Sequence, residues 1–271
     1  MPRKFRRGLG AALLASAALL LAPAAASAAG ASGPPRLVCS GGPIVAGRYT
    51  SITVTGVCFM PGGVVTVLGP LRVAPGAALL ANFPATGSGP EGDATVIVDG
   101  GVRVGKDATL MLGCSPYLGC THTTSDRVDG GLRAWDALGV ILHSDSFRGD
   151  VSLRGGGGGV SCVPSGVFAS IGAPPYSDLE DNTVRGHLSV SGLDSCWFGM
   201  LRNMVHGSVS VRDNTMADPD SMEVLQNTIW GHLSCEGNLP AVQFGDSGAS
   251  PNQVRGKATG QCASPISERF A

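Results

Sequence analysis

Two groups of carboxylates in the chain could take part in acid–base chemistry. Asp218, Asp220 and Glu223 lie within one short segment, and Glu180 and Asp181 are adjacent in another. Enzymes that cleave acidic polysaccharides use carboxylates as acids, bases or nucleophiles, sometimes together with Ca²⁺. A calcium loop needs more oxygen ligands at alternating spacing, and the Asp-Pro-Asp sequence also favours a simple turn. We therefore predict a solvated turn and keep catalysis as the alternative.

A second motif of catalytic type is Gly245-Asp246-Ser247-Gly248, which matches the sequence around the nucleophile of trypsin-like serine proteases. Such a serine needs a histidine to take its proton and an aspartate to orient that histidine. No histidine of the chain stands in the Thr-Ala-Ala-His-Cys context of those enzymes. We interpret the motif as a polar turn.

Basic and aromatic residues recur on both sides of a repeated glycine. Arginine and lysine bind carboxylate and phosphate groups, and tryptophan stacks on sugar rings. We predict that these residues form a solvent-facing strip that binds an anionic glycan. The alternative is a charged surface that serves solubility alone. The strip consists of Arg185, His187, His206, Trp230, His232, Arg255 and Lys257.

The sequence predicts neither a metal ion nor a cofactor. His187 and His232 should lie two coils apart, about 9.6 Å at the spacing of β-strands, which is too far to share a metal ion. The chain has no Cys-x-x-Cys motif and no histidine at ligand spacing from a cysteine pair, so a zinc site built on cysteine is not expected.

The elements that would position the strip follow a repeat. An apolar residue, a glycine two positions later and two further apolar residues at alternate positions recur from residue 67 to residue 260. Four positions before the later glycines stands a column of acidic or amide residues, and three positions after them stands a column of hydroxyl residues. The first column is Asp126, Asp145, Asn182, Asn203, Asn227 and Asn252. The second is Ser152, Ser189, Ser210, Ser234 and Thr259.

Alternating apolar residues indicate β-strands, and a single short strand with a turn cannot bury its apolar face unless copies of it stack. Stacked asparagines can form a hydrogen-bonded ladder when every coil places them in register. We therefore predict an all-β fold: a right-handed parallel β-helix over residues 62–271, with about 20–25 residues per coil. Residues 29–61 should form a disulfide-bonded N-terminal cap. A β-sandwich is the competing fold, but it does not predict the two columns.

All eight cysteines follow the first thirty residues, and an even number in an exported chain indicates disulfides. The simplest arrangement pairs neighbours in the sequence, although eight cysteines allow about 105 pairings. The neighbouring pairs are Cys39–Cys58, Cys114–Cys120, Cys162–Cys196 and Cys235–Cys262.

The N-terminus predicts export. Four basic residues, an apolar stretch from Leu9 to Leu21 and a small-residue site ending at Ala28 make residues 1–28 a secretory signal peptide. The chain carries a net charge of −1. Removal of the signal peptide would leave 15 basic and 20 acidic residues. Such a balance argues against binding nucleic acid. Since no later apolar run has membrane length, we expect a protein outside the cell or at its surface, with no membrane insertion after cleavage.

Three segments carry a resemblance: VRVGKDA at 102–108, DNTV at 181–184 and NTMADPD at 214–220. In them the chain resembles a family of uncharacterised secreted actinobacterial β-solenoid proteins, over most of the length after residue 28. More distantly, its coil pattern is similar to right-handed parallel β-helix proteins of the pectate-lyase type. The first family implies no activity, and likeness of fold alone carries no chemistry.

These observations predict a secreted, non-enzymatic structural or binding protein whose partner is an anionic glycan or a cell-envelope polymer. The alternative is a polysaccharide lyase or glycoside hydrolase that acts on an acidic polysaccharide. Carboxylates that face one groove from adjacent coils would favour the enzyme, whereas basic and hydroxyl columns without such carboxylates favour the binding protein.

Overall fold

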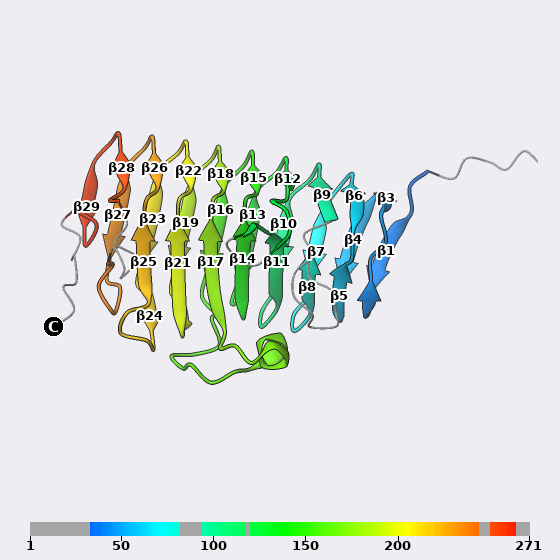
Figure 1. The fold of residues 1–271 in the computed structure, drawn as a ribbon, viewed down its shortest axis with the longest axis horizontal. Coiled ribbons are helices and arrows are strands. Elements are labelled where there is room, and N and C mark those ends of the chain that lie inside the picture. Colours follow the sequence, from blue (N-terminus) through cyan, green and yellow to red (C-terminus); the bar gives the residue numbers. More distant parts are fainter. Residues whose placement is uncertain (1–32, 82–93, 117–119, 244–249, 264–271) are drawn as a thin grey trace, which may run out of the picture. The chain divides into compact units, whose positions relative to one another are not determined.

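Three parallel β-sheets, here named A, B and C, stack coil upon coil in the computed structural model (Figure 1). The structure describes residues 33–81, 94–116, 120–243 and 250–263. The chain passes from sheet C to sheet A, then to sheet B, and back to sheet C one coil further along. This is the predicted parallel β-helix, so the prediction of fold class is confirmed. The predicted signal peptide and the Gly-Asp-Ser-Gly motif lie outside the described residues.

Sheet A consists of β1 (Arg36–Cys39), β4 (Ser51–Val54), β7 (Leu71–Val73), β10 (Val102–Val104), β13 (Leu132–Trp135), β16 (Val151–Arg154), β19 (Leu188–Ser191), β23 (Val209–Arg212), β27 (Leu233–Glu236) and β29 (Ala258–Gly260). Sheet B consists of β2 (Gly42–Pro43), β5 (Val57–Met60), β8 (Ala78–Ala81), β11 (Thr109–Gly113), β14 (Gly139–His143), β17 (Tyr176–Glu180), β21 (Trp197–Leu201) and β25 (Met222–Leu225).

Sheet C consists of β3 (Gly47–Tyr49), β6 (Gly63–Val67), β9 (Ala94–Val98), β12 (Arg127–Val128), β15 (Ser146–Phe147), β18 (Thr183–Val184), β22 (Met204–Val205), β26 (Thr228–Ile229) and β28 (Gln253–Val254). A further pair, β20 (Asp194–Ser195) and β24 (Thr215–Met216), extends the corner between sheets A and B. The short 3-10 helix η2 (Gly166–Ile171) lies in the insertion between β16 and β17.

Alternation of apolar and polar residues decides which side chains enter the helix. In one coil Val184, Leu188 and Val190 point inward and are buried, while the residues between them face out. Because neighbouring coils pair in register, Leu188 stacks on Val209 in the next coil. Aliphatic side chains thus form continuous inner rows, and burial of these rows is what makes isolated coils unstable and stacked coils stable.

The helix begins earlier than the sequence indicated. In the segment predicted as a cap, β1 pairs with β4, which pairs with β7, and β5 pairs with β8. The described part of residues 29–61 therefore supplies coils of the same three sheets, and position 62 is not a boundary between two structures. The Cys39–Cys58 disulfide joins β1 to β5 in these first coils. The segment closes the end of the helix by continuing its own hydrogen-bonded ladder.

The amide column forms a ladder inside the corner between sheets B and C. Asn182 donates from Nδ2 to Oδ1 of Asn203 at 3.0 Å, and Asn203 donates in the same way to Asn227 at 2.9 Å. Asn227 continues the ladder to Asn252 at 2.9 Å. These bonds span 21, 24 and 25 residues, so the predicted length of the later coils is also confirmed. The left-handed backbone of this corner falls one position earlier than the amide, as at Arg202 (φ 56°).

The glycine column results from close approach of successive coils. The backbone N–H of Gly231 donates to the carbonyl oxygen of Gly207 at 3.0 Å, and Gly207 donates likewise to Gly186. Neither Gly207 nor Gly231 has a positive φ, so conformational freedom is not the reason for glycine. A Cβ on Gly231 would instead lie 2.6 Å from the Gly207 carbonyl oxygen. The column is glycine because nothing larger fits between the coils.

We expect Gly231→Ala to lower the free energy of unfolding by about 2 kcal/mol, since overpacking of a fitted site costs about 1–3 kcal/mol. Gly47→Ala is the matched control, because a Cβ there would make only an ordinary contact, 3.6 Å from the Tyr49 hydroxyl. Urea denaturation of both variants measures the difference. Equal stability of the two variants would contradict the role given to the glycine column.

The four disulfides join the cysteines that neighbour one another in the sequence: Cys39–Cys58, Cys114–Cys120, Cys162–Cys196 and Cys235–Cys262. No cysteine is left free among them. The third bond ties the insertion that carries η2 to the residue before β21, and the fourth ties β27 to the last described coil. Disulfides of this number are typical of chains that fold in an oxidising environment. The described residues include no helix of a length and apolar character suited to spanning a membrane.

Candidate functional site

The predicted strip lies on the turns that lead from sheet C to sheet A. Its members stand directly before or directly after the glycines of the column, in two parallel rows. All of them are exposed except Trp230, which is partly buried. The row before the glycines holds Arg148, Arg185, His206, Trp230 and Arg255, and the row after them holds Asp150, His187, Ser208, His232 and Lys257.

Trp230 is held between the residues of the two neighbouring coils. The His206 ring is stacked on its indole with centroids 4.5 Å apart and planes 3° apart. The Arg255 guanidinium lies over the indole from the next coil, 5.2 Å from the ring centroid. These contacts occupy the indole faces that a sugar ring would stack on. Trp230 is therefore less open than its place in the repeat indicated, and stacking of a sugar on it stays a prediction.

The two histidines of the second row form hydrogen bonds to the backbone of the next coil. Nδ1 of His187 accepts a hydrogen bond from the Ser208 backbone N–H at 3.0 Å, and Nδ1 of His232 accepts one from Lys257 at 2.9 Å. A nitrogen that accepts carries no proton, so each neutral ring has its proton on Nε2. Only that second nitrogen is left to meet a ligand. The structure thus gives His187 and His232 a structural role beside the predicted one.

Three further arginines form a row on the outer face of sheet A. Arg72 is in register with Arg103, and Arg103 with Arg133, in three successive coils. All three are exposed, and coils stack at about 4.8 Å. None of them takes part in an ion pair among the described residues. Like charges in such a row repel one another, and a polyanion laid along the helix axis would relieve that repulsion.

The hydroxyl column continues this arginine row. Arg133 is in register with Ser152, and the row then runs through Ser189, Ser210 and Ser234. Ser189 donates from Oγ to Ser152 Oγ at 3.0 Å. This outward row of sheet A begins with Val38 and Thr53, is then basic over three coils, and is hydroxylated after them. The sequence carried the signal, since Arg72, Arg103 and Arg133 also stand three positions after a glycine.

Two shallow hollows mark the same face. One, of about 320 Å³, lies between Arg103 and Arg133 over the backbone of the glycine column. The other, of about 400 Å³, lies between Arg154 and Arg212 over the serines. Trp135, in register with Arg154, is 48% exposed and stands on this face. The outer face of sheet A, rather than the turn strip alone, thus offers open basic groups, hydroxyls and a free aromatic ring.

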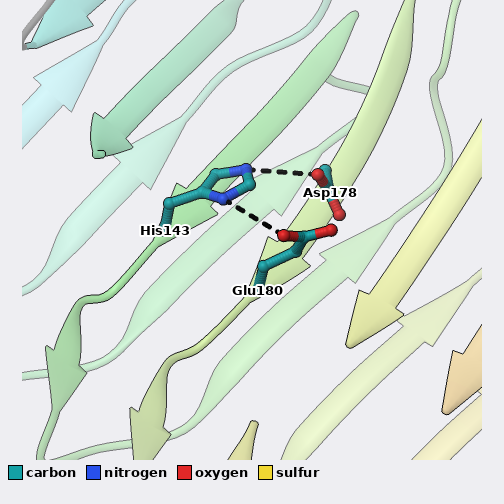
Figure 2. A group of neighbouring side chains, drawn as sticks. All are labelled: His143, Asp178 and Glu180. Carbon is teal, nitrogen blue, oxygen red and sulfur yellow. Dashed lines mark ion pairs between the residues drawn. The ribbon is translucent and has the colours of Figure 1, made fainter. Parts of the chain in front are cut away.

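A second candidate site lies on the outer side of sheet B and joins two adjacent coils (Figure 2). His143 of β14 is in register with Glu180 of β17, and Asp178 stands two residues before Glu180 on the same strand. The His143 Nε2 is 3.2 Å from Asp178 Oδ2, and its Nδ1 is 3.7 Å from Glu180 Oε2. The His143 side chain is fully buried, while the Asp178 and Glu180 side chains are 6% and 13% exposed.

Burial governs the charge of this second site. Desolvation raises the pKa of Asp178, and His143 and Arg202 partly oppose that rise. Desolvation and the charge of Asp178 raise the pKa of Glu180, again against Arg202 and His143. Arg202 forms ion pairs with Glu180 and with Asp181, at 2.7 Å to Asp181 Oδ1. Two carboxylates thus lie in a dry environment that one arginine neutralises only in part.

Sequence reasoning singled out Glu180 and Asp181 but missed His143 and Asp178. The contact between His143 and Asp178 joins residues 35 positions apart. The insertion that holds η2 lies between them, so their separation does not match the length of the other coils and the repeat did not indicate the contact. The structure does not bring the predicted Asp218 and Asp220 into this cluster. Asp218 Oδ1 instead accepts the backbone N–H of Asp220 at 3.0 Å, which is the turn predicted for that segment.

No family model, curated protein or solved structure matches this chain. The resemblance to secreted actinobacterial solenoid proteins therefore stays a prediction, and the two sites have to be interpreted from their own geometry.

Proposed function

We propose that the protein is a secreted, non-enzymatic β-helix that binds an anionic glycan or cell-envelope polymer along the outer face of sheet A. The observation that carries the proposal is the row of Arg72, Arg103 and Arg133. These guanidinium groups repeat once per coil without a carboxylate partner among the described residues. A flexible polymer with an acidic group on successive units can pair with such a row, and the arginine geometry favours carboxylate and phosphate oxygens.

Charge distribution supports the same partner. The outer rows of sheet A carry more basic than acidic side chains, although the chain as a whole has a net charge of −1. A positive face on an otherwise acidic protein attracts polyanions to one side and repels them elsewhere. The basic members are Arg36, Arg72, Arg103, Arg133, Arg154, Arg212 and the adjoining Lys257, and the acidic ones are Glu236 and the adjoining Asp150.

The disulfides support the secreted part of the proposal. Four bonds account for every cysteine of the chain, and such bonds persist outside the cytosol. Together with the predicted signal peptide they favour a role at the cell surface or beyond it. An envelope or extracellular polymer is the anionic partner found there.

The test is a titration with polygalacturonate, a polymer with one carboxylate per sugar, against neutral dextran as the uncharged reference. The variant carries Arg72→Ser, Arg103→Ser and Arg133→Ser together. Serine already occupies this row at Ser152 and later, so the variant should fold. We expect a Kd about 10-fold weaker, since three exposed ion pairs of about 0.5 kcal/mol each sum to the free energy of one factor of ten.

A matched control removes three positive charges elsewhere, through Arg48→Ser, Arg148→Ser and Arg185→Ser. Arg48 lies in β3, and the other two follow strands of sheet C directly. The control should bind polygalacturonate nearly as well as the unchanged protein. Equal loss in both variants would show attraction by net charge alone, and loss only in the control would move the site to the turn strip. Either result contradicts the proposed face.

One observation favours the enzyme alternative: Asp178 and Glu180 face the same side of sheet B, next to His143 on the adjacent coil. A lyase or hydrolase for acidic polysaccharide would use such carboxylates as acid and base. The buried state of His143 speaks against direct contact with a polymer. We therefore place binding before catalysis, and an assay for new reducing ends or unsaturated products distinguishes the two.

A further inference from the structure

The buried cluster of His143, Asp178 and Glu180 contains polar atoms that the protein itself leaves without hydrogen-bond partners. Both ring nitrogens of His143 and Oδ1 of Asp178 are inaccessible to solvent and make no hydrogen bond. An unpaired buried polar group costs about 1–3 kcal/mol. Such atoms within one buried cluster indicate that a further group satisfies at least part of them.

The charges of the cluster point to the kind of group that is needed. The cluster and its neighbour Asp181 supply three carboxyl groups, whereas a single arginine, Arg202, forms ion pairs with Glu180 and Asp181. The carboxyl groups therefore outnumber the arginine by two. Uncompensated negative charge is costly in a buried site. A divalent cation balances it.

The geometry fits such a cation. One ligand atom from each of His143, Asp178 and Glu180 can be chosen so that all three lie within 4.8 Å of one another. Ligands about 2.0–2.2 Å from a tetrahedral ion lie about 3.3–3.6 Å apart, and His143 Nε2 lies 3.2 Å from Asp178 Oδ2. Small movements of the side chains would bring all three ligand atoms within bonding distance of one ion. Figure 2 shows the imidazole and both carboxylates directed toward one another from β14 and β17.

We propose that His143, Asp178 and Glu180 bind one Zn²⁺ ion that links two adjacent coils on the outer side of sheet B. A nitrogen ligand with two carboxylates suits zinc, whereas Ca²⁺ and Mg²⁺ take oxygen ligands. A water molecule completes the tetrahedral set. Arg202 holds Glu180 from the next coil and orients it, which is the part that outer-sphere groups play around metal ligands.

The experiment uses the whole purified protein, stripped with EDTA, and ZnCl₂ as the probe. Binding is followed by isothermal titration, by metal analysis after gel filtration and by the shift of Tm. Thiols cannot confuse the result, because all eight cysteines form disulfides. We expect one zinc per chain and a Tm that rises by several degrees with saturating zinc.

Asp178→Asn is the decisive variant, because it keeps the size of the side chain and removes the ligand charge. Its fold should be retained, since it also removes a desolvated carboxylate, and far-UV circular dichroism checks this. We expect its zinc Kd to weaken by about 100-fold or more. Asp194→Asn makes the same chemical change at an exposed position, and His122→Asn removes an exposed histidine; both should leave zinc binding unchanged.

Two outcomes would overturn the proposal. The unchanged protein could fail to retain stoichiometric zinc, in which case the cluster is a network of contacts between His143 and its two carboxylates. Alternatively, zinc could bind Asp178→Asn as tightly as the unchanged protein, which would assign the ion to exposed histidines. Neither outcome bears on the arginine face of sheet A, so this test is independent of the proposed glycan binding.

Discussion

Asn203→Leu should lower the free energy of unfolding by about 3 kcal/mol or more. Asn203 is fully buried and lies in the middle of the amide ladder. Its Oδ1 accepts the N–H and the Nδ2 of Asn182, and its Nδ2 donates to Asn227 and to the Leu179 carbonyl oxygen. Leucine removes all four bonds and leaves buried partners unsatisfied, at about 1–3 kcal/mol for each group. Denaturation in urea, followed by circular dichroism, measures the loss.

Asn252→Leu is the matched control for this prediction. Asn252 is the last described member of the ladder and is only partly buried. Water can replace its bonds, so we expect about 1 kcal/mol or less. A ladder that stabilises the helix from within predicts a clear difference between the two variants. Similar losses for both would contradict the ladder, and the amides would then act only as corner formers.

Asp145→Asn should raise the free energy of unfolding by about 2 kcal/mol near neutral pH. Asp145 occupies the ladder row, and its two carboxylate oxygens are buried without hydrogen-bond partners. Burial raises its pKa well above the ordinary value, the charge of Asp126 raises it further, and the nearby His143 backbone lowers it in part. An asparagine removes the charge, and its Nδ2 can donate to Asn182 Oδ1, as Asn182 donates to Asn203. Thermal and urea unfolding measure the gain.

The pH dependence of the same variant gives a second readout. A carboxyl group whose pKa is higher in the folded state keeps its proton there while the unfolded chain loses it. The folded protein therefore binds more protons, and its stability falls as pH rises from the ordinary pKa through the raised one. Asp145→Asn should reduce this fall, so its advantage should be large at pH 7 and small at pH 3. An advantage that does not depend on pH would assign the gain to packing or hydrogen bonds alone.

The columns of the sequence predicted the fold because a β-helix repeats one environment in every coil. Alternating valines and leucines identified the inward rows, and the glycines identified the place where coils touch. A second amide ladder, Asn214 to Asn238 to Gln261, went unnoticed. The position before Asn214 in this row is Leu193, which has no side-chain amide; only its backbone N–H donates to Asn214 Oδ1. Because this row has only three amide members, it could not be distinguished in the sequence from amide residues that recur by chance.

The candidate sites were harder to predict because they depend on neighbours across coils. Trp230 looked exposed from its position in the strand pattern, but whether its faces are free depends on His206 and Arg255 in adjacent coils. The buried cluster depends on an insertion that lengthens one coil and brings His143 beside Asp178. Spacing along one chain cannot give such a contact. The arginine row, in contrast, was present in the repeat, three positions after the earlier glycines, and required only that the hydroxyl column be followed into the preceding coils.

The central claim is that the outer face of sheet A binds an anionic polymer without cleaving it. A glycan array probed with the purified protein, with a product assay on every bound glycan, tests this most directly. We expect binding to carboxylated or phosphorylated polymers, none to neutral ones, and no new reducing ends or unsaturated products. Binding that ignores charge, or release of products from a bound polymer, would contradict it.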